Sequence, residues 1–111
     1  MSETIYNIPI VTNGDMSGNI TSSAIDLSKT DGYSVDAQWT GSPVGTLKLQ
    51  VSRDGINFYD YPSSSISTSG ISSAFWEITT VNYSKVQLVY TASTGSGTLN
   101  AGILGKGDLL A

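Results

Sequence analysis

Residues 33–40 of this chain read Tyr33-Ser34-Val35-Asp36-Ala37-Gln38-Trp39-Thr40. Every odd position carries an aromatic or aliphatic side chain, and every even position carries a polar one. Successive side chains of a β-strand point to opposite faces, so this period of two predicts a strand with one buried face and one solvated face. Strands of this kind are typical of antiparallel sheets.

The same alternation continues on both sides of this stretch. Residues 46–52 and residues 85–91 repeat it, with inward side chains Leu47, Leu49 and Val51 in the first and Val86, Leu88 and Tyr90 in the second. Weaker strand patterns cover residues 5–12, 21–27, 58–61, 74–81 and 97–106. Pro9 lacks an N–H group, so the first of these is expected at a sheet edge. Turn-forming residues separate the runs, and no segment has a sustained helical period.

About eight short strands without helices predict an all-β fold, a single antiparallel β-sandwich with jelly-roll-like or immunoglobulin-like connectivity. A small barrel is the alternative. We expect one domain over residues 1–111, a hairpin turn at Asp54-Gly55, and a Ser-rich mobile or contact loop at residues 63–73. The predicted core consists of the inward side chains Tyr33, Val35, Ala37, Trp39, Leu47, Leu49, Val51, Phe58, Trp76, Ile78, Val86, Leu88, Tyr90, Leu99 and Ile103.

The composition excludes several classes of function. The chain has no Cys and no His, which rules out a disulfide framework, a thiolate or imidazole zinc site and a nucleophile–histidine pair within the chain. A formal net charge of −4 argues against binding to duplex nucleic acid. No apolar window is long enough for a membrane span, and the N-terminal residues do not resemble a signal peptide. We expect a protein made in a cytoplasm, with no membrane partner, no cofactor and no metal.

Carboxylates are the remaining candidates for catalysis. Asp36, Asp60 and Glu77 lie on predicted strands, and two of them close together would resemble a glycosidase pair. The favoured interpretation is that Asp36 and Glu77 face outward, opposite Lys48 or Lys85. We therefore expect no enzymatic activity.

Residues 52–58, Ser-Arg-Asp-Gly-Ile-Asn-Phe, have the polar pattern of a tight turn. They resemble the Asp-box turn of sialidase-type propellers, but Gly55 directly follows Asp54, which is one residue too early, and the motif occurs once. A hairpin turn is the favoured interpretation. Asp54 and Asn57 are too few ligands for calcium, which takes six to eight oxygens.

Three groups of residues are candidates for contacts with partners. Tyr59 and Tyr61 are expected to face outward together, where two rings would stack on a sugar, contact a protein or stabilise the sheet. The first strand is expected to contribute Ile5, Tyr6 and Ile8 through its unpaired edge. The apolar tail residues Leu109 and Leu110 are expected to pack on the body or on a neighbouring subunit.

Two stretches of this sequence, residues 39–58 and residues 86–99, resemble segments of small phage virion proteins. Their shared positions are Trp39, Gly41, Pro43, Gly45, Leu47, Gln50, Ser52, Asp54, Gly55 and Phe58, followed by Val86, Leu88, Tyr90, Gly95, Gly97 and Leu99. The resemblance implies a β-sandwich structural protein of the virion, made in the host bacterial cytoplasm. It supplies no catalytic residues.

The resemblance implies a protein that either decorates the head shell or forms part of a tail or spike. The favoured hypothesis is a capsid decoration protein that binds the assembled head shell. Its partners would be the major capsid protein or other virion proteins and its own copies, with a trimer favoured because closed symmetric oligomers fit the symmetry axes of a shell. The alternative is a carbohydrate-binding or host-adhesion module of a tail or spike, which would use Tyr59, Tyr61 and residues 63–73.

Overall fold

The computed structural model describes residues 3–27, 32–79, 81 and 83–108. These ranges contain strands, turns and bends, and within them no helix is long and apolar enough to cross a membrane. The strands are β1 (Glu3–Asp15), β2 (Ile20–Thr21), β3 (Ile25–Asp26), β4 (Gly32–Gly41), β5 (Val44–Ser52), β6 (Tyr59–Asp60), β7 (Ile66–Ser67), β8 (Ser73–Ile78), β9 (Lys85–Thr94) and β10 (Gly97–Asp108). The strands predicted at residues 33–40, 46–52 and 85–91 are confirmed as β4, β5 and β9.

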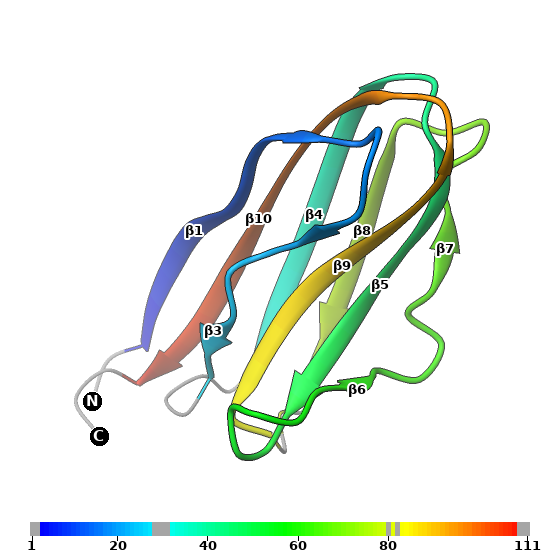
Figure 1. The fold of residues 1–111 in the computed structure, drawn as a ribbon. Coiled ribbons are helices and arrows are strands. Elements are labelled where there is room, and N and C mark those ends of the chain that lie inside the picture. Colours follow the sequence, from blue (N-terminus) through cyan, green and yellow to red (C-terminus); the bar gives the residue numbers. More distant parts are fainter. Residues whose placement is uncertain (1–2, 28–31, 80, 82, 109–111) are drawn as a thin grey trace.

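Two antiparallel sheets form the molecule (Figure 1). The first sheet has the order β1-β10-β4-β8, and the second has β9 and β5 at its centre. On the outer sides of this second sheet, β2 and β3 both pair with β9, and β6 and β7 both pair with β5. Each of these short pairs occupies one strand position. The described strands therefore fill eight positions, and the predicted β-sandwich is confirmed.

The connectivity is that of a jelly roll. The first strand pairs with the last (β1 with β10), β2 and β3 pair with β9, β4 pairs with β8, and β5 pairs with β6 and β7. This nesting of early strands against late ones is the arrangement of a double-sheet jelly roll. The structure thus selects one of the connectivities that the sequence left open. It also places β1 at an edge of the first sheet, as Pro9 predicted.

The core lies between the two sheets and contains the predicted alternating side chains. On the first sheet, Leu99 lies opposite Trp39 and Ile103 lies opposite Val35. On the second, Leu49 lies opposite Leu88. All six side chains are buried. Since each large apolar side chain contributes about 1.5–3 kcal/mol when buried, this interior is the main source of stability.

Of the predicted core residues, Phe58 is the one that does not lie in the core. It is half-buried and does not belong to the core cluster, because it lies in the turn before β6 rather than on a strand. Val51 and Trp76 pack against the core while half-buried. Met16, by contrast, was not predicted, yet it is fully buried just after β1.

Residues 63–73, predicted as a Ser-rich mobile or contact loop, are attached to the second sheet. They contain β7, which pairs with β5, and their small polar side chains bind the backbone of the sandwich. The buried Ser64 hydroxyl accepts a hydrogen bond from Leu49 N (3.0 Å) and donates one to Tyr61 O (2.7 Å). The buried Thr68 hydroxyl donates to Pro43 O (3.1 Å). The hydroxyl groups of Ser64 and Thr68 attach this segment to the second sheet.

Candidate interaction surface

The three carboxylates considered for catalysis lie on two different sheets. Asp36 (β4) and Glu77 (β8) face outward on the first sheet, opposite Phe75 and Ser34 respectively. Asp60 (β6) belongs to the second sheet. Asp36 and Glu77 face outward, as the favoured interpretation expected. Neither of them lies opposite Lys48 or Lys85.

Lys48 pairs with Asp60 instead, with its Nζ 3.1 Å from Asp60 Oδ1. Gln50 Nε2 also donates to that oxygen at 3.0 Å. These hydrogen bonds lower the pKa of the exposed Asp60 carboxyl. Among the residues that the structure describes, no three acidic side chains lie close enough together to hold a metal ion.

Residues 52–58 form a closed turn between β5 and β6, which confirms the hairpin prediction. Asp54 Oδ1 accepts the backbone N–H groups of Asn57 and Ile56, both at 2.9 Å. Asn57 Nδ2 donates to the other carboxylate oxygen at 2.9 Å. These bonds hold the pKa of the Asp54 carboxyl below its usual range. Because both oxygens are engaged within the turn, Asp54 has a structural role there.

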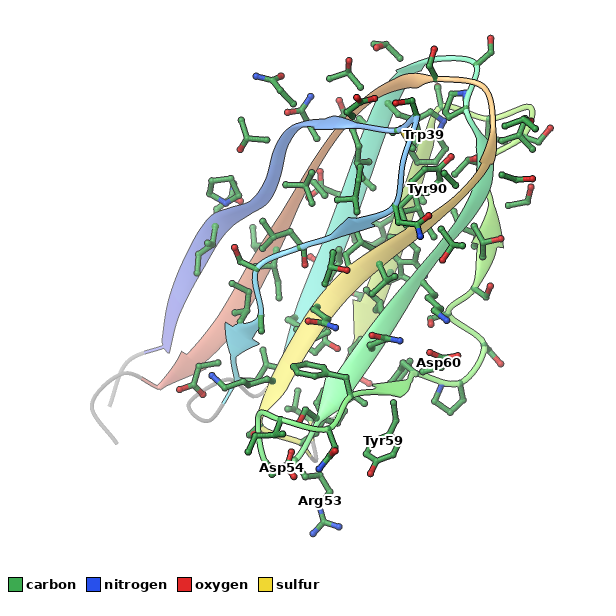
Figure 2. All side chains as sticks on the ribbon, viewed as in Figure 1. Trp39, Arg53, Asp54, Tyr59, Asp60 and Tyr90 are labelled. Atoms are coloured by element: carbon green, nitrogen blue, oxygen red, sulfur yellow. The ribbon has the colours of Figure 1, made fainter. Side chains whose placement is uncertain are left out.

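The two tyrosines predicted to form an exposed pair lie in different environments. Tyr59 is 65% exposed and projects from the same end of the molecule as Arg53 and Asp54 (Figure 2). Tyr61 is half-buried and packs edge to face on Tyr83, with ring centroids 6.0 Å apart. The prediction of an outward pair fails because it assigned the two rings to the wrong face. Asp60 is the outward residue of β6, whereas Tyr59 pairs with Val51. Tyr61 N donates to the backbone oxygen of the buried Leu49 at 2.8 Å. The two tyrosines therefore lie on the inward side, where Tyr83 covers Tyr61.

Tyr83 joins the interior through a second tyrosine. Its hydroxyl lies 2.8 Å from the hydroxyl of Tyr33, whose ring is buried. Burial, together with this hydrogen bond, raises the pKa of the Tyr33 phenol far above its usual range. Tyr61, Tyr83 and Tyr33 therefore form a structural cluster at one end of the sandwich.

The contact residues predicted on the first strand lie on an edge of the first sheet. β1 pairs with β10 on one side and is the terminal strand of the sheet order. Ile8 is 37% exposed at this edge. Ile5 and Tyr6 pair with Lys106 and Gly105, and the directions of their side chains lie outside what the structure describes. Leu109 and Leu110 lie outside the described residues, so their contacts stay a prediction.

A groove on the outer face of the first sheet was not predicted from the sequence. It crosses β1, β10 and β4, has a volume of about 410 Å³, and is lined mainly by polar residues. Its polar lining and its floor are contributed by Asn7, Thr12, Asp36, Gln38, Asn100 and Gly102. The alternation of residues 33–40 places Asp36 and Gln38 on the solvated face. Nothing in the sequence indicates that residues 7–12 and 100–102 lie beside them.

Comparisons with known proteins show the fold. No protein-family model matches this chain, and no curated protein matches its sequence. Among solved structures, the SPBc2 prophage-derived protein YomS is similar, with a TM-score of 0.61 and 10% identity over 94% of this chain and 96% of that one. The coat protein of Tobacco streak virus has a TM-score of 0.52 and 10% identity over 96% of this chain and 86% of that one.

A third similar structure comes from infectious bursal disease virus, Gt strain. It has a TM-score of 0.53 and 11% identity over 94% of this chain, which spans 32% of that longer chain. At these identities the likeness is one of architecture. Nearly the whole of this chain thus adopts a sandwich that a prophage-derived protein and two viral proteins also contain.

Proposed function

We propose that this chain is a structural protein of a phage particle, and specifically a decoration protein that binds the outside of the assembled head shell. The observation that supports the proposal is the jelly roll itself. Over more than nine-tenths of the chain it matches a prophage-derived protein and the coat protein of a plant virus. In this role the chain acts by binding and catalyses no reaction.

The residues that resemble phage virion proteins support the same proposal because they build this fold. Trp39 is buried, and its Nε1 donates to Ile71 O at 2.9 Å. A Cβ atom at Gly45 would come within 2.8 Å of the Tyr90 ring, so this position needs glycine, and Gly55 has a positive φ of 79° in the hairpin turn. Most of the shared positions are core and turn positions, which supports a common sandwich.

Attachment would use the outer edge of β1. An edge strand presents backbone N–H and C=O groups that pair readily with a strand of another protein. The half-exposed Ile8 adds an apolar contact beside these groups. A contact of this kind, extended over about 800 Å² on each partner, is typical of a specific interface. The partners would be the major capsid protein and further copies of this chain, as a trimer.

The direct test is the protein composition of purified particles. Particles are collected by density gradient from a culture that produces the phage, and the proteins are identified by mass spectrometry. We expect this chain in the particles, and electron cryomicroscopy should show it as regular density outside the head shell. The proposal would be wrong if the chain is absent from particles and the purified protein fails to sediment with heads that lack it.

A further inference from the structure

The polar groove on the outer face of the first sheet has a defined physical origin. In the first sheet β10 lies between β1 and β4 (Figure 1), and residues of these three strands, with Gly102 of β10 among them, line the groove. β1 has two register shifts against β10, between Pro9 and Val11 and between Val11 and Gly14. Such bulges bend a strand out of regular pairing. The bend in β1 and the absence of a side chain on Gly102 leave the centre of the sheet face hollow.

Three oxygen atoms surround the open position above Gly102. A Cβ atom placed on this glycine would lie 3.5 Å from Asp36 Oδ1, 3.5 Å from Ile8 O and 3.6 Å from Asn7 Oδ1. These distances are ordinary van der Waals contacts, so a side chain at Gly102 would fit here and the space above the backbone is open. All three groups are hydrogen-bond acceptors that face the same point from two different strands.

The side chains around this point are free to bind a ligand. Within the described part of the chain, no hydrogen bond or ion pair engages the side chains of Asp36, Gln38 or Asn7. Asn100 is different, because its Oδ1 accepts the backbone N–H of Asn13 at 2.9 Å. This bond orients the amide of Asn100 and leaves its Nδ2 available as a donor. The groove therefore offers acceptors at Asp36 and Asn7 and an oriented donor at Asn100.

We propose that this groove binds a neutral saccharide through adjacent hydroxyl groups. A sugar hydroxyl donates one hydrogen bond and accepts others, so neighbouring hydroxyls fit a carboxylate acceptor beside amide donors and acceptors. Hydrogen bonds to a charged group are the stronger kind, which makes Asp36 the principal contact. The volume of the groove, about 410 Å³, lies within the range of small-molecule sites.

Two features of the surrounding face restrict the saccharide class. Asp36 and Glu77 both lie on this face, so an acidic sugar would meet like charge. Phe75 lies directly opposite Asp36 on β8 and is 65% exposed. Its ring offers an apolar surface beside the polar groove for the C–H groups of a second sugar unit. The binding site goes beyond the proposed role in the particle, which does not require it.

A divalent cation is the competing occupant of the same oxygen atoms. Calcium takes six to eight oxygen ligands and is bound mainly by several carboxylates. Asp36 supplies the single carboxylate of the groove lining. Neutral amide and carbonyl oxygens make up the remainder, which favours hydroxyl groups over a metal ion.

The test is a titration followed by NMR of the ¹⁵N-labelled full chain. The probes are the methyl glycosides of glucose, galactose, mannose and N-acetylglucosamine, with sialic acid and calcium chloride as separate arms. We expect at least one neutral glycoside to shift the signals of Gly102 and of the Asn100 side-chain amide at millimolar concentration. Sialic acid should bind more weakly.

The variants distinguish the groove from the rest of the face. D36N should weaken binding about tenfold or more, while E77Q, which removes the neighbouring charge outside the groove, should change it by less than about twofold. G102V fills the space above β10 and should abolish binding, and its amide spectrum reports whether the fold is intact. D36N provides the same test if G102V does not fold.

Three results would overturn the saccharide site. They are the absence of shifts with every neutral glycoside, equal weakening by D36N and E77Q, and shifts at Gly102 with calcium chloride or sialic acid that match or exceed those with the neutral sugars. None of these results bears on whether the chain is present in phage particles. The saccharide site and the proposed role in the particle can therefore fail separately.

Discussion

Two buried tyrosines differ in what their hydroxyl groups contact. The hydroxyl of Tyr33 lies 2.8 Å from that of Tyr83, so it is hydrogen-bonded. The hydroxyl of Tyr90 is fully buried and has no hydrogen-bond partner among the described residues. A buried polar group without a partner costs about 1–3 kcal/mol, whereas a typical satisfied bond contributes about 0.5–1.5 kcal/mol. The two residues therefore make opposite contributions to stability.

Removing each hydroxyl should change the free energy of unfolding in opposite directions. We expect Tyr90→Phe to raise it by about 1 kcal/mol and Tyr33→Phe to lower it by about 1 kcal/mol. Urea denaturation followed by tryptophan fluorescence measures both variants against the parent chain. Equal destabilisation by the two substitutions would mean that Tyr90 has a hydrogen-bond partner, such as a buried water.

The turn at Asp54 should make stability depend on pH. Its carboxyl has an ordinary pKa of 3.8 in the unfolded chain and a lower pKa in the fold. A lowered pKa stabilises the folded chain above pH 3.8, and this contribution is lost as the pH falls through the folded value. The contribution is therefore fully present at neutral pH.

Asp54→Asn isolates this effect. We expect the variant to be less stable than the parent at neutral pH and the difference to shrink progressively below pH 3.8. Urea denaturation at a series of pH values gives the comparison. A difference that stays constant across the series would show that the charge of Asp54 does not contribute.

At the scale of single elements, the pairing of β5 with β9 depends on a glycine. Gly45 lies beside β9, and a Cβ atom there would meet the backbone oxygen of Thr91 and come within 2.6 Å of the Tyr90 hydroxyl. The Thr91 backbone oxygen cannot move without disturbing the pairing of β5 with β9. The close approach of two central strands therefore depends on the missing side chain.

Gly45→Ala should lower the free energy of unfolding by about 3 kcal/mol, the upper end of the range for overpacked sites. Gly18→Ala is the matched control, because a Cβ atom at Gly18 would have no heavy atom within 4 Å. We expect the control to stay within about 0.5 kcal/mol of the parent chain, as surface substitutions usually do. A similar loss in both variants, measured by thermal unfolding, would argue against steric overlap at Gly45.

The free edge of β1 can be tested separately from the stability of the fold. Ile8→Asp places a charge on the proposed contact edge, and Val44→Asp places the same charge on β5 in the other sheet. Both parent side chains are 37% exposed. We expect Ile8→Asp to reduce binding to heads at least about tenfold and Val44→Asp to leave it unchanged. Equal binding of the two variants in co-sedimentation would exclude the β1 edge as the contact.

At the scale of the whole molecule, the two outer faces have different chemistry. The outer face of the second sheet carries hydrogen-bonded polar groups, among them Lys48, Asp60, Gln50 and Gln87. The first sheet presents acidic residues, the polar groove and the exposed side chains of Phe75 and Leu104. Contacts with partners and ligands are therefore expected on the first sheet and along its β1 edge.

The proposed homo-oligomer can be tested in solution. We expect sedimentation equilibrium to give three times the 11.6 kDa mass of the chain, because symmetric closure is the usual way in which copies cover such an edge. Ile8→Asp should shift the equilibrium to the monomer if copies contact one another through β1. A parent chain that stays monomeric at high concentration would contradict the trimer.

Much of the fold could be predicted from local sequence pattern. Trp39, Leu49 and Leu88 alternate with polar neighbours, and alternation within a strand depends only on backbone geometry. The turn at Asp54-Gly55 was predictable for a similar reason, since its hydrogen bonds join residues within three positions of one another. The sequence also excluded disulfides and histidine chemistry.

Only the tertiary structure decided which distant segments lie side by side. The groove forms because Asn7, Asp36 and Asn100 meet across three strands whose pairing joins the two ends of the chain. The burial of Met16 and the different exposure of Tyr59 and Tyr61 also depend on how the strands close into two sheets. Strand alternation is a property of neighbouring residues, whereas these juxtapositions arise from long-range pairing, which leaves no period in the sequence.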